Sequence, residues 1–156
     1  MDNDRTFLSR AIRIAVDGIN KGGGPFGAVI SREGKIIAEA NNRVVMSHDP
    51  TAHAEVLAIR KASDILNTHD LSGCVIYASC EPCPMCLGAI YWAGIRKVVY
   101  ASDRKDASAA GFNDSFMYEE MSLDPSERKI LFIHMPEAGG GEAFNRWEQY
   151  EDRVAY

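Results

Sequence analysis

Three potential zinc ligands and one carboxylate occupy two short segments of this sequence. His53 and Glu55 are separated by one residue, and Cys83 and Cys86 lie in the run Pro82-Cys83-Pro84-Met85-Cys86. A structural zinc site fills all four tetrahedral positions with protein side chains, whereas a catalytic site uses three and keeps the fourth for water. We expect His53, Cys83 and Cys86 to be the ligands of one zinc ion per chain. Glu55 is then available to move protons to and from that water.

The spacing within each pair fits a position at the start of a helix. Cys83 and Cys86 are three residues apart, which places both sulfur atoms on one helical face. The partial positive charge of a helix N-terminus favours the thiolate form that zinc requires. His53 and Glu55, two residues apart, would diverge in a helix interior, but side chains at a helix start tilt toward the N-terminus. Both can therefore reach one centre placed just beyond that start.

The cysteines leave two other interpretations open. Cys83 and Cys86 alone would suit a redox dithiol, and Cys80 could complete a closed structural zinc site as a fourth ligand. Glu55 separates these alternatives from catalysis, because a zinc ion that is only structural has no use for a nearby carboxylate. Cys74 begins an apolar run of the sequence, and we expect it to be a buried small hydrophobic residue.

Length and composition are those of one globular domain. The chain has 156 residues with 46% hydrophobic and 25% charged residues, which is ordinary for a soluble domain that buries a core. The N-terminal Met1-Asp2-Asn3-Asp4-Arg5 has no apolar run after a basic start, so we expect no signal peptide. No stretch approaches the roughly 20 apolar residues of a membrane span. We therefore expect a cytoplasmic protein of one domain, residues 1–156, without a membrane partner.

The net charge argues against nucleic acid as a partner. The 17 Lys and Arg residues are outnumbered by 22 Asp and Glu residues, which gives a net charge of −5 without a block of basic residues. Binding to a phosphate backbone normally needs a basic surface. The composition therefore favours a small-molecule substrate over a large polyanion.

Strands and helices alternate along the chain after an initial helix and a hairpin. Asp49-Pro50 is expected to open the second helix, with His53 and Glu55 in its first turn. The order of elements predicts an α/β domain with three α/β/α layers and a mixed sheet. Both zinc segments follow a strand and open a helix, which puts them at the carboxyl ends of strands. Apolar spacing and turn signals predict helices at 4–19, 49–67, 81–94 and 142–151, and strands at 26–31, 36–40, 74–79, 98–101 and 130–134.

Four segments of the chain resemble the cytidine-deaminase-like superfamily of zinc enzymes, and most closely its bacterial guanine deaminases. The pairs His-x-Glu and Pro-Cys-x-x-Cys are a known signature of zinc-dependent nucleobase deaminases. The Gly-Phe-x-Asp-x-Phe run and the terminal Tyr156 point more narrowly to the guanine deaminases. Asn113 departs from that pattern where an acidic residue is expected, but Asp114, which resembles the family's active-site acid, is present. The four segments are 23–30, 49–56, 79–92 and 110–116, within a similarity that spans most of residues 5 to 121.

The resemblance implies hydrolytic deamination of guanine, a purine base, to xanthine and ammonia by a zinc-dependent homodimer with a five-stranded sheet. Glu55 would be the catalytic acid and base, and Asp114 would contact the purine edge as a candidate second proton shuttle. For Phe26, Asn42 and Trp92 the alternatives are packing in a strand, a place in a turn and packing of a helix. The residues implied to bind substrate are Phe26, Asn42, Ala54, Trp92, Asp114 and Tyr156.

The resemblance also concerns the C-terminal tail, residues 139–156. In guanine deaminases the C-terminal segment is exchanged between subunits and covers the partner's active site. Gly139-Gly140-Gly141 would suit the hinge that such an exchange needs, and an ordinary surface loop is the alternative. The rival functions are a tRNA adenosine deaminase, a deaminase of another small amino-heterocycle such as cytosine or guanosine, and a zinc module without catalysis.

Overall fold

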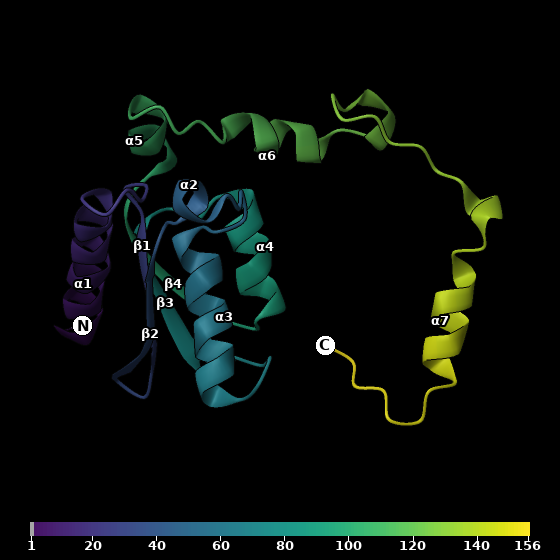
Figure 1. The fold of residues 1–156 in the computed structure, drawn as a ribbon, viewed down its shortest axis with the longest axis horizontal. Helices are drawn as coiled ribbons and strands as arrows, with labels where there is room; N and C mark the ends of the chain where they lie inside the picture. Colours follow the sequence, from purple (N-terminus) through teal and green to yellow (C-terminus); the bar gives the residue numbers. More distant parts are fainter. Residues whose placement is uncertain (1) are drawn as a thin grey trace. The chain divides into compact units, whose positions relative to one another are not determined.

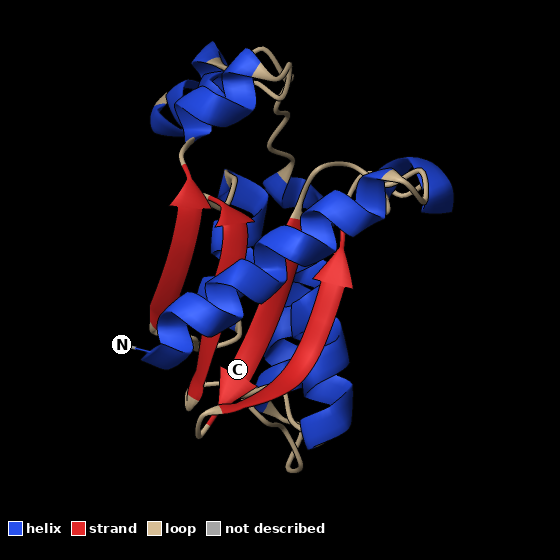
Figure 2. Ribbon diagram, turned by 90° about the vertical axis from the view of Figure 1, so that its left-hand side faces the viewer, coloured by secondary structure: helices blue, strands red, loops and turns tan. Residues whose placement is uncertain are grey.

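A mixed four-stranded sheet forms the centre of the first of two units of the chain. The computed structural model describes residues 2–156; the first unit ends at Ser115, and the second runs from Phe116 to Tyr156. β1 runs antiparallel to both β2 and β3, and β3 runs parallel to β4, which confirms the expected mixed sheet. The strands, drawn in red in Figure 2, are β1 (Gly27–Arg32), β2 (Lys35–Asn41), β3 (Cys74–Cys80) and β4 (Lys97–Ser102), in the spatial order β2-β1-β3-β4.

Helices cover both faces of this sheet, as Figure 1 shows. Successive residues of β1 point to opposite faces: Val29 packs with Phe7 of α1, while Ala28 and Ile30 pack with residues of α3 and α4. The expected layers of helix, sheet and helix are therefore present. No helix within residues 2–156 is both long and apolar enough to cross a membrane. The helices of the first unit are α1 (Asp2–Ile19), α2 (Val44–Ser47), α3 (Ala54–Leu66), α4 (Pro84–Trp92) and α5 (Arg104–Ala109).

The helix expected to open at Asp49-Pro50 begins instead at Ala54. The Asp49 carboxylate accepts hydrogen bonds from the N–H and the hydroxyl group of Thr51, at 2.8 and 2.7 Å. Asp favours such a local turn wherever its side chain bonds nearby backbone instead of capping a helix. His53 is consequently the N-cap of α3 rather than a residue of its first turn.

The fifth strand expected at residues 130–134 is absent, so the expected number of strands is wrong for residues 2–156. The segment has no regular secondary structure, and Ile130, Leu131 and Ile133 are 72%, 81% and 71% exposed. A strand needs a neighbour that takes up its backbone N–H and C=O groups. Apolar residues alone predicted the strand, but the second unit contains no other strand with which this segment could pair.

The second unit has helices but no core of its own. None of the residues from Phe116 to Tyr156 is buried, and large apolar side chains such as Phe144 are exposed. Because burial of apolar surface is the main force that stabilises a fold, this unit lacks that source of stability within one chain. α7 confirms the final helix expected near its position, although it ends earlier. The elements are α6 (Ser115–Ser122), which begins at the unit boundary, the 3-10 helices η1 (Pro125–Glu127) and η2 (Pro136–Ala138), and α7 (Gly141–Glu148).

Candidate metal centre

His53 and Cys83 occupy the same kind of position, the N-cap of a helix that follows a loop. The Leu57 N–H donates to the His53 carbonyl at 3.0 Å, and the Leu87 N–H donates to the Cys83 carbonyl at 2.8 Å. N-caps are usually Ser, Thr, Asp or Asn, whose side chains bond the free N–H groups of the helix. The His53 and Cys83 side chains make no such bond, so they are available for a metal ion instead.

The ligand atoms of the three residues lie at distances that suit one tetrahedral ion. His53 Nδ1 is 3.5 Å from Cys83 Sγ and 3.5 Å from Cys86 Sγ, and the three ligand atoms lie within 4.8 Å of one another. Zinc bonds of about 2.0–2.1 Å to nitrogen and 2.3 Å to sulfur, at tetrahedral angles, separate these atoms by roughly 3.6 Å. The structure thus brings the three expected ligands together in a geometry that fits zinc.

Hydrogen bonds among the three potential ligands shift their pKa values. The pKa of the Cys83 thiol is lowered to about 4, chiefly because Cys86 donates a hydrogen bond to its sulfur. The pKa of the Cys86 thiol is raised by the same hydrogen bond and by burial. The pKa of His53 is raised, first by its hydrogen bond with Cys83. A zinc ion would replace these protons, because metal binding requires thiolates and a neutral imidazole.

Glu55 lies at the edge of the metal centre without belonging to its ligand set. Its Oε2 atom is 3.5 Å from Cys86 Sγ, and its side chain is buried. Burial raises the pKa of the Glu55 carboxyl above its ordinary value. A carboxyl group with a raised pKa beside a reacting centre is suited to accept and return a proton.

Asp114 carries a buried carboxylate oxygen. The pKa of His53 is raised chiefly by its hydrogen bond with Cys83 and that of Cys80 chiefly by burial, and the negative charge of Asp114 adds a smaller increase to both. The Asp114 Oδ1 atom is buried and has no hydrogen-bond partner among residues 2–156. A buried acceptor without a donor is costly, so this oxygen is ready to accept from a bound molecule.

Cys80 does not join the zinc ligands. Its Sγ atom donates a hydrogen bond to the Asp103 carbonyl at 3.5 Å, and it is absent from the group formed by the three ligands. Burial raises the pKa of the Cys80 thiol to about 11, which disfavours the thiolate that zinc needs. The arrangement therefore favours a site with an open fourth position over a closed structural one. Cys74 is a buried core residue, as expected.

Two of the expected substrate contacts, Phe26 and Asn42, are bonded to each other through their backbones. The Asn42 N–H donates to the Phe26 carbonyl at 2.9 Å, and Asn42 Oδ1 accepts from the Val44 N–H at 3.2 Å. The Asn42 amide nitrogen has no partner within residues 2–156, so two donors are left for a ligand. A Cβ atom at Gly24 would lie 3.0 Å from Asn42 Oδ1, so a glycine at this position avoids a close contact with the Asn42 side chain. Ala54 begins α3, where backbone N–H groups have no intrahelical acceptor.

Two expected substrate contacts, Trp92 and Tyr156, are exposed in the single chain. Trp92 is the last residue of α4 and is 70% exposed. It lies six residues beyond Cys86, which is about 9 Å along a helix, whereas the ligands sit at the opposite end. Tyr156 belongs to the second unit and is exposed.

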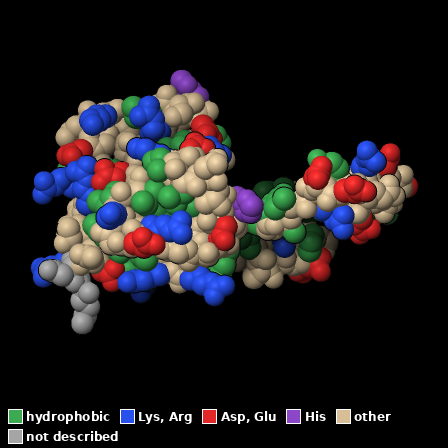
Figure 3. Space-filling model, turned by 90° about the horizontal axis from the view of Figure 1, so that it is seen from below, with side chains coloured by type: hydrophobic (Ala, Val, Ile, Leu, Met, Phe, Trp, Pro, Cys, Tyr) green, Lys and Arg blue, Asp and Glu red, His purple; other side chains and the backbone are tan. Residues whose placement is uncertain are grey.

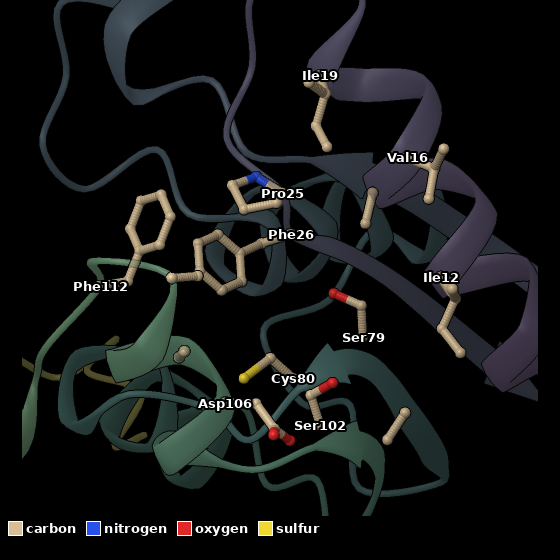
Figure 4. A pocket seen from close by; sticks show the side chains of 14 residues that line it. Ile12, Val16, Ile19, Pro25, Phe26, Ser79, Cys80, Ser102, Asp106 and Phe112 are labelled. Atoms are coloured by element: carbon tan, nitrogen blue, oxygen red, sulfur yellow. The ribbon is translucent and has the colours of Figure 1, made fainter.

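A cavity of about 260 Å³ adjoins Phe26 and Cys80. Its lining comes from α1, the ends of β3 and β4, and α5, and it includes none of the zinc ligands. Figure 4 shows Phe26 and Phe112 next to each other, and their rings pack edge to face with centroids 4.9 Å apart. Phe112 was not among the expected site residues, although it stands two residues before Asp114 in a segment singled out from the sequence.

Known proteins resemble this chain over most of its length. Residues 1–102 match the family described as the cytidine and deoxycytidylate deaminase zinc-binding region. The guanine deaminase of Bacillus subtilis is 50% identical over 155 residues, which cover 99% of this chain and 99% of that protein. The X-ray structure of guanine deaminase from Bacillus subtilis matches with a TM-score of 0.95, covering 97% of this chain and 98% of that one.

A second class of relatives covers less of the chain. The tRNA-specific adenosine deaminase of Aquifex aeolicus is 47% identical over 100 residues, which cover 64% of this chain and 66% of that protein. Its identity over the matched part is close to that of the guanine deaminase, so the zinc centre does not separate the two classes. The match to the guanine deaminase also includes the remainder of the chain.

Proposed function

The chain belongs to the zinc-binding cytidine and deoxycytidylate deaminase family, and we propose that it is a hydrolase that converts guanine to xanthine and ammonia. Zinc is the cofactor, and His53, Cys83 and Cys86 would hold it. The observation that supports guanine as the substrate is Asp114, whose buried carboxylate oxygen has no donor within residues 2–156. Full-length similarity to a guanine deaminase supports the same substrate.

Among the common nucleobases, guanine has a hydrogen-bond donor on the ring nitrogen next to its exocyclic amino group. A protein acceptor such as a carboxylate can therefore bind both groups. The 2-amino group of guanine and the neighbouring ring N1–H are both donors, whereas the amino groups of adenine and cytosine neighbour a ring nitrogen that accepts. An ionised carboxylate only accepts hydrogen bonds. Asp114 would therefore pair with the donor edge of guanine and leave adenine or cytosine with two acceptors facing each other.

The chain's own residues account for the remaining steps of a hydrolytic deamination. Bound zinc supplies Lewis-acid chemistry, because it lowers the pKa of a coordinated water toward neutrality. Glu55, buried beside Cys86, would carry one proton of that water to a ring nitrogen, where it stays, and the second proton to the amino group, which leaves as ammonia. The donors of Asn42 and the ring of Phe26 would orient the base, and the Ala54 N–H would stabilise developing negative charge.

A panel of bases assayed for ammonia release tests this proposal. We expect guanine to exceed cytosine, guanosine and adenosine in tRNA by at least about 10²-fold in kcat/KM, because a site built to bond a donor edge rejects partners without it. Lys and Arg side chains are interspersed with Asp and Glu on the face shown in Figure 3, which does not favour a polyanion. Preferred deamination of tRNA would move the chain to the adenosine deaminases.

We also propose that the protein is a homodimer in which each second unit docks on the partner chain. β4 pairs only with β3 within residues 2–156, so one of its edges is open, and open edges are usually covered. The exposed apolar segment 130–134 would add to that edge in the partner and supply the fifth strand. A Cβ atom built at any of the three glycines 139–141 would have no atom of another residue within 4 Å. This open surrounding would allow the segment to act as a hinge.

In this dimer the C-terminal residues would close the partner's active site. A small planar base leaves the metal centre open to water, and excluding water strengthens electrostatic catalysis. Tyr156, at the end of the tail, and Trp92, at the far end of α4, would then contact substrate only across the interface. Analytical ultracentrifugation would test the dimer, and a monomer at working concentration would contradict it.

Deleting residues 152–156 is expected to lower guanine turnover at least about tenfold, which corresponds to roughly 1.4 kcal/mol of lost transition-state stabilisation. Circular dichroism and zinc content should stay near those of the full chain, since the tail has no buried residue. A mixture of Glu55→Gln chains with tail-deleted chains should recover part of the activity, because in a mixed dimer the tail-deleted chain keeps Glu55 and receives the intact tail of its partner. Normal turnover by the truncated enzyme would reject the lid.

We propose a cytoplasmic location on the basis of the chemistry of the ligands. All four cysteines are free thiols, and two of them must be reduced to bind zinc. Thiols persist in the reducing cytosol and are oxidised in secretory compartments. We therefore place the enzyme in the cytoplasm, and cell fractionation would check that assignment.

A further inference from the structure

An ion pair between Glu81 and Arg104 joins the two halves of the proposed active site. We propose that these two are positioning residues, which hold Phe112 and Asp114, here called the substrate wall, in place relative to the zinc ligands. The proposal rests on the proposed function, because the substrate wall matters only if a base binds against it. Neither Glu81 nor Arg104 is among the expected ligands or substrate contacts.

The Glu81 carboxylate bonds both the side chain and the backbone of Arg104. Arg104 Nη2 donates to Glu81 Oε1 at 2.6 Å, and the Arg104 backbone N–H donates to Glu81 Oε2 at 3.3 Å. The Glu81 N–H donates in turn to the Ser102 carbonyl at 2.8 Å. Two hydrogen bonds therefore fix the start of α5 against Glu81, and the third ties Glu81 to the end of β4.

On one side, Glu81 is connected directly to the zinc ligands. It follows Cys80 at the end of β3 and stands two residues before Cys83, the N-cap of α4. Pro82 lies between Glu81 and Cys83, and its ring fixes the backbone φ angle at that point. A displacement of the Glu81 backbone would therefore also displace the Cys83 sulfur, because the connection through Pro82 is rigid.

On the other side, Arg104 is connected to the substrate wall through α5. The helix is closed at its start by a capping box between Asp103 and Asp106, which stiffens the first turn. Beyond its end the Phe112 N–H donates to the Ala107 carbonyl at 2.9 Å. Phe112 then packs on Phe26 with a ring angle of 86°. A shift of Arg104 would therefore move α5 and, with it, Phe112 of the substrate wall.

The pair is placed to affect catalysis more than stability. The side chains of Arg104 and Glu81 are 41% and 20% exposed, and ion pairs with such exposure contribute little to folding. Residues that support metal ligands or orient substrate, in contrast, commonly change activity by about 10–100-fold when they are replaced. A shift of the wall by about 1 Å is enough for a loss of that size.

A double-mutant cycle on full-length protein tests the proposal. We expect Glu81→Gln and Arg104→Gln each to lower kcat/KM for guanine by about 10–100-fold, and the double variant to be no worse than the weaker single one, because the residues act as a unit. Zinc should stay near one per chain in all three. The matched control is the pair Arg10–Glu39, which is bonded at 2.8 and 2.9 Å between α1 and β2; Glu39→Gln and Arg10→Gln should change kcat/KM less than twofold.

Guanine binding provides a readout that does not depend on turnover. In a Glu55→Gln background, calorimetry should show guanine binding weakened at least tenfold by Glu81→Gln, with zinc retained. Unchanged binding and turnover in the Glu81 and Arg104 variants would overturn the inference, as would an equal loss in the Arg10–Glu39 controls. Loss of zinc in Glu81→Gln would overturn it too and assign the residue to metal retention. If Glu81→Gln does not fold, Arg104→Gln gives the same comparison. Failure of the wild type to bind or deaminate guanine would instead reject the proposed function.

Discussion

Replacing Glu55 by Gln is expected to lower guanine turnover by at least 10²-fold while zinc stays bound at about one per chain. General acid–base catalysis commonly contributes 10²–10⁴-fold, and Glu55 is the buried carboxyl group beside Cys86. Gln has nearly the same shape but cannot take up a proton from water. Turnover is measured by ammonia release, and bound metal by elemental analysis.

The two measurements separate a proton carrier from a ligand. Zinc loss in Glu55→Gln would make Glu55 a fourth ligand and the site a closed one, although the three ligand atoms already form a group without it. Retention of both zinc and full activity would reject the proton-transfer role. Glu39→Gln is a matched control, because it makes the same chemical change on the far strand β2 and should leave turnover unaltered.

The metal centre was predictable because its residues depend on local structure. His53 and Cys83 follow loops and begin helices, and both their types and their spacings are visible within a few residues of sequence. The core of the sheet was predictable for a similar reason, since alternating residues such as Val29 and Ile30 fill the two faces of β1. Local signals of this kind do not require knowledge of the tertiary fold.

The rest of the site depends on contacts that the sequence does not reveal. Glu81 and Arg104 are 23 residues apart and meet because β3 and β4 lie parallel, with Cys80 opposite Ser102. The resemblance implied that Trp92 contacts substrate, and within one chain Trp92 stands at the end of α4 opposite to the zinc ligands. The missing fifth strand has the same origin, because an apolar segment becomes a strand only where a neighbouring strand is available.

The charge argument against nucleic acid also changes once the two units are known. Of the 17 basic and 22 acidic residues, 13 basic and 13 acidic ones precede Phe116, so the net charge of −5 belongs entirely to the second unit. The first unit, which carries the zinc ligands, is neutral overall. Total charge therefore says little about the deaminase part itself, and the hydrogen-bonding groups at the site must decide between guanine and RNA.

Asp114→Asn is the variant that tests this hydrogen-bonding argument. We expect kcat/KM for guanine to fall at least 10²-fold, equal to about 2.7 kcal/mol of transition-state stabilisation, with zinc still bound. Asn offers one acceptor and two donors, so it would set a donor against the donor edge of guanine. Asn113→Asp is the matched control, because Asn113 is exposed and its Oδ1 accepts from the Ser115 N–H at 3.0 Å, a bond that Asp can keep. Its activity should stay within about threefold of wild type.

A substrate analogue makes the test specific to the predicted contact. 2-Aminopurine carries the same 2-amino group as guanine, but its neighbouring N1 atom is an acceptor. The wild type should therefore prefer guanine, and Asp114→Asn should reduce the ratio of kcat/KM for guanine over 2-aminopurine by at least about tenfold, since the amide can donate to N1. A general loss of activity through misfolding or zinc loss would lower both rates and leave the ratio unchanged. An unchanged ratio with intact zinc would show that Asp114 does not read the edge of the base, and the preference for guanine would then have to come from Asn42 or from the tail.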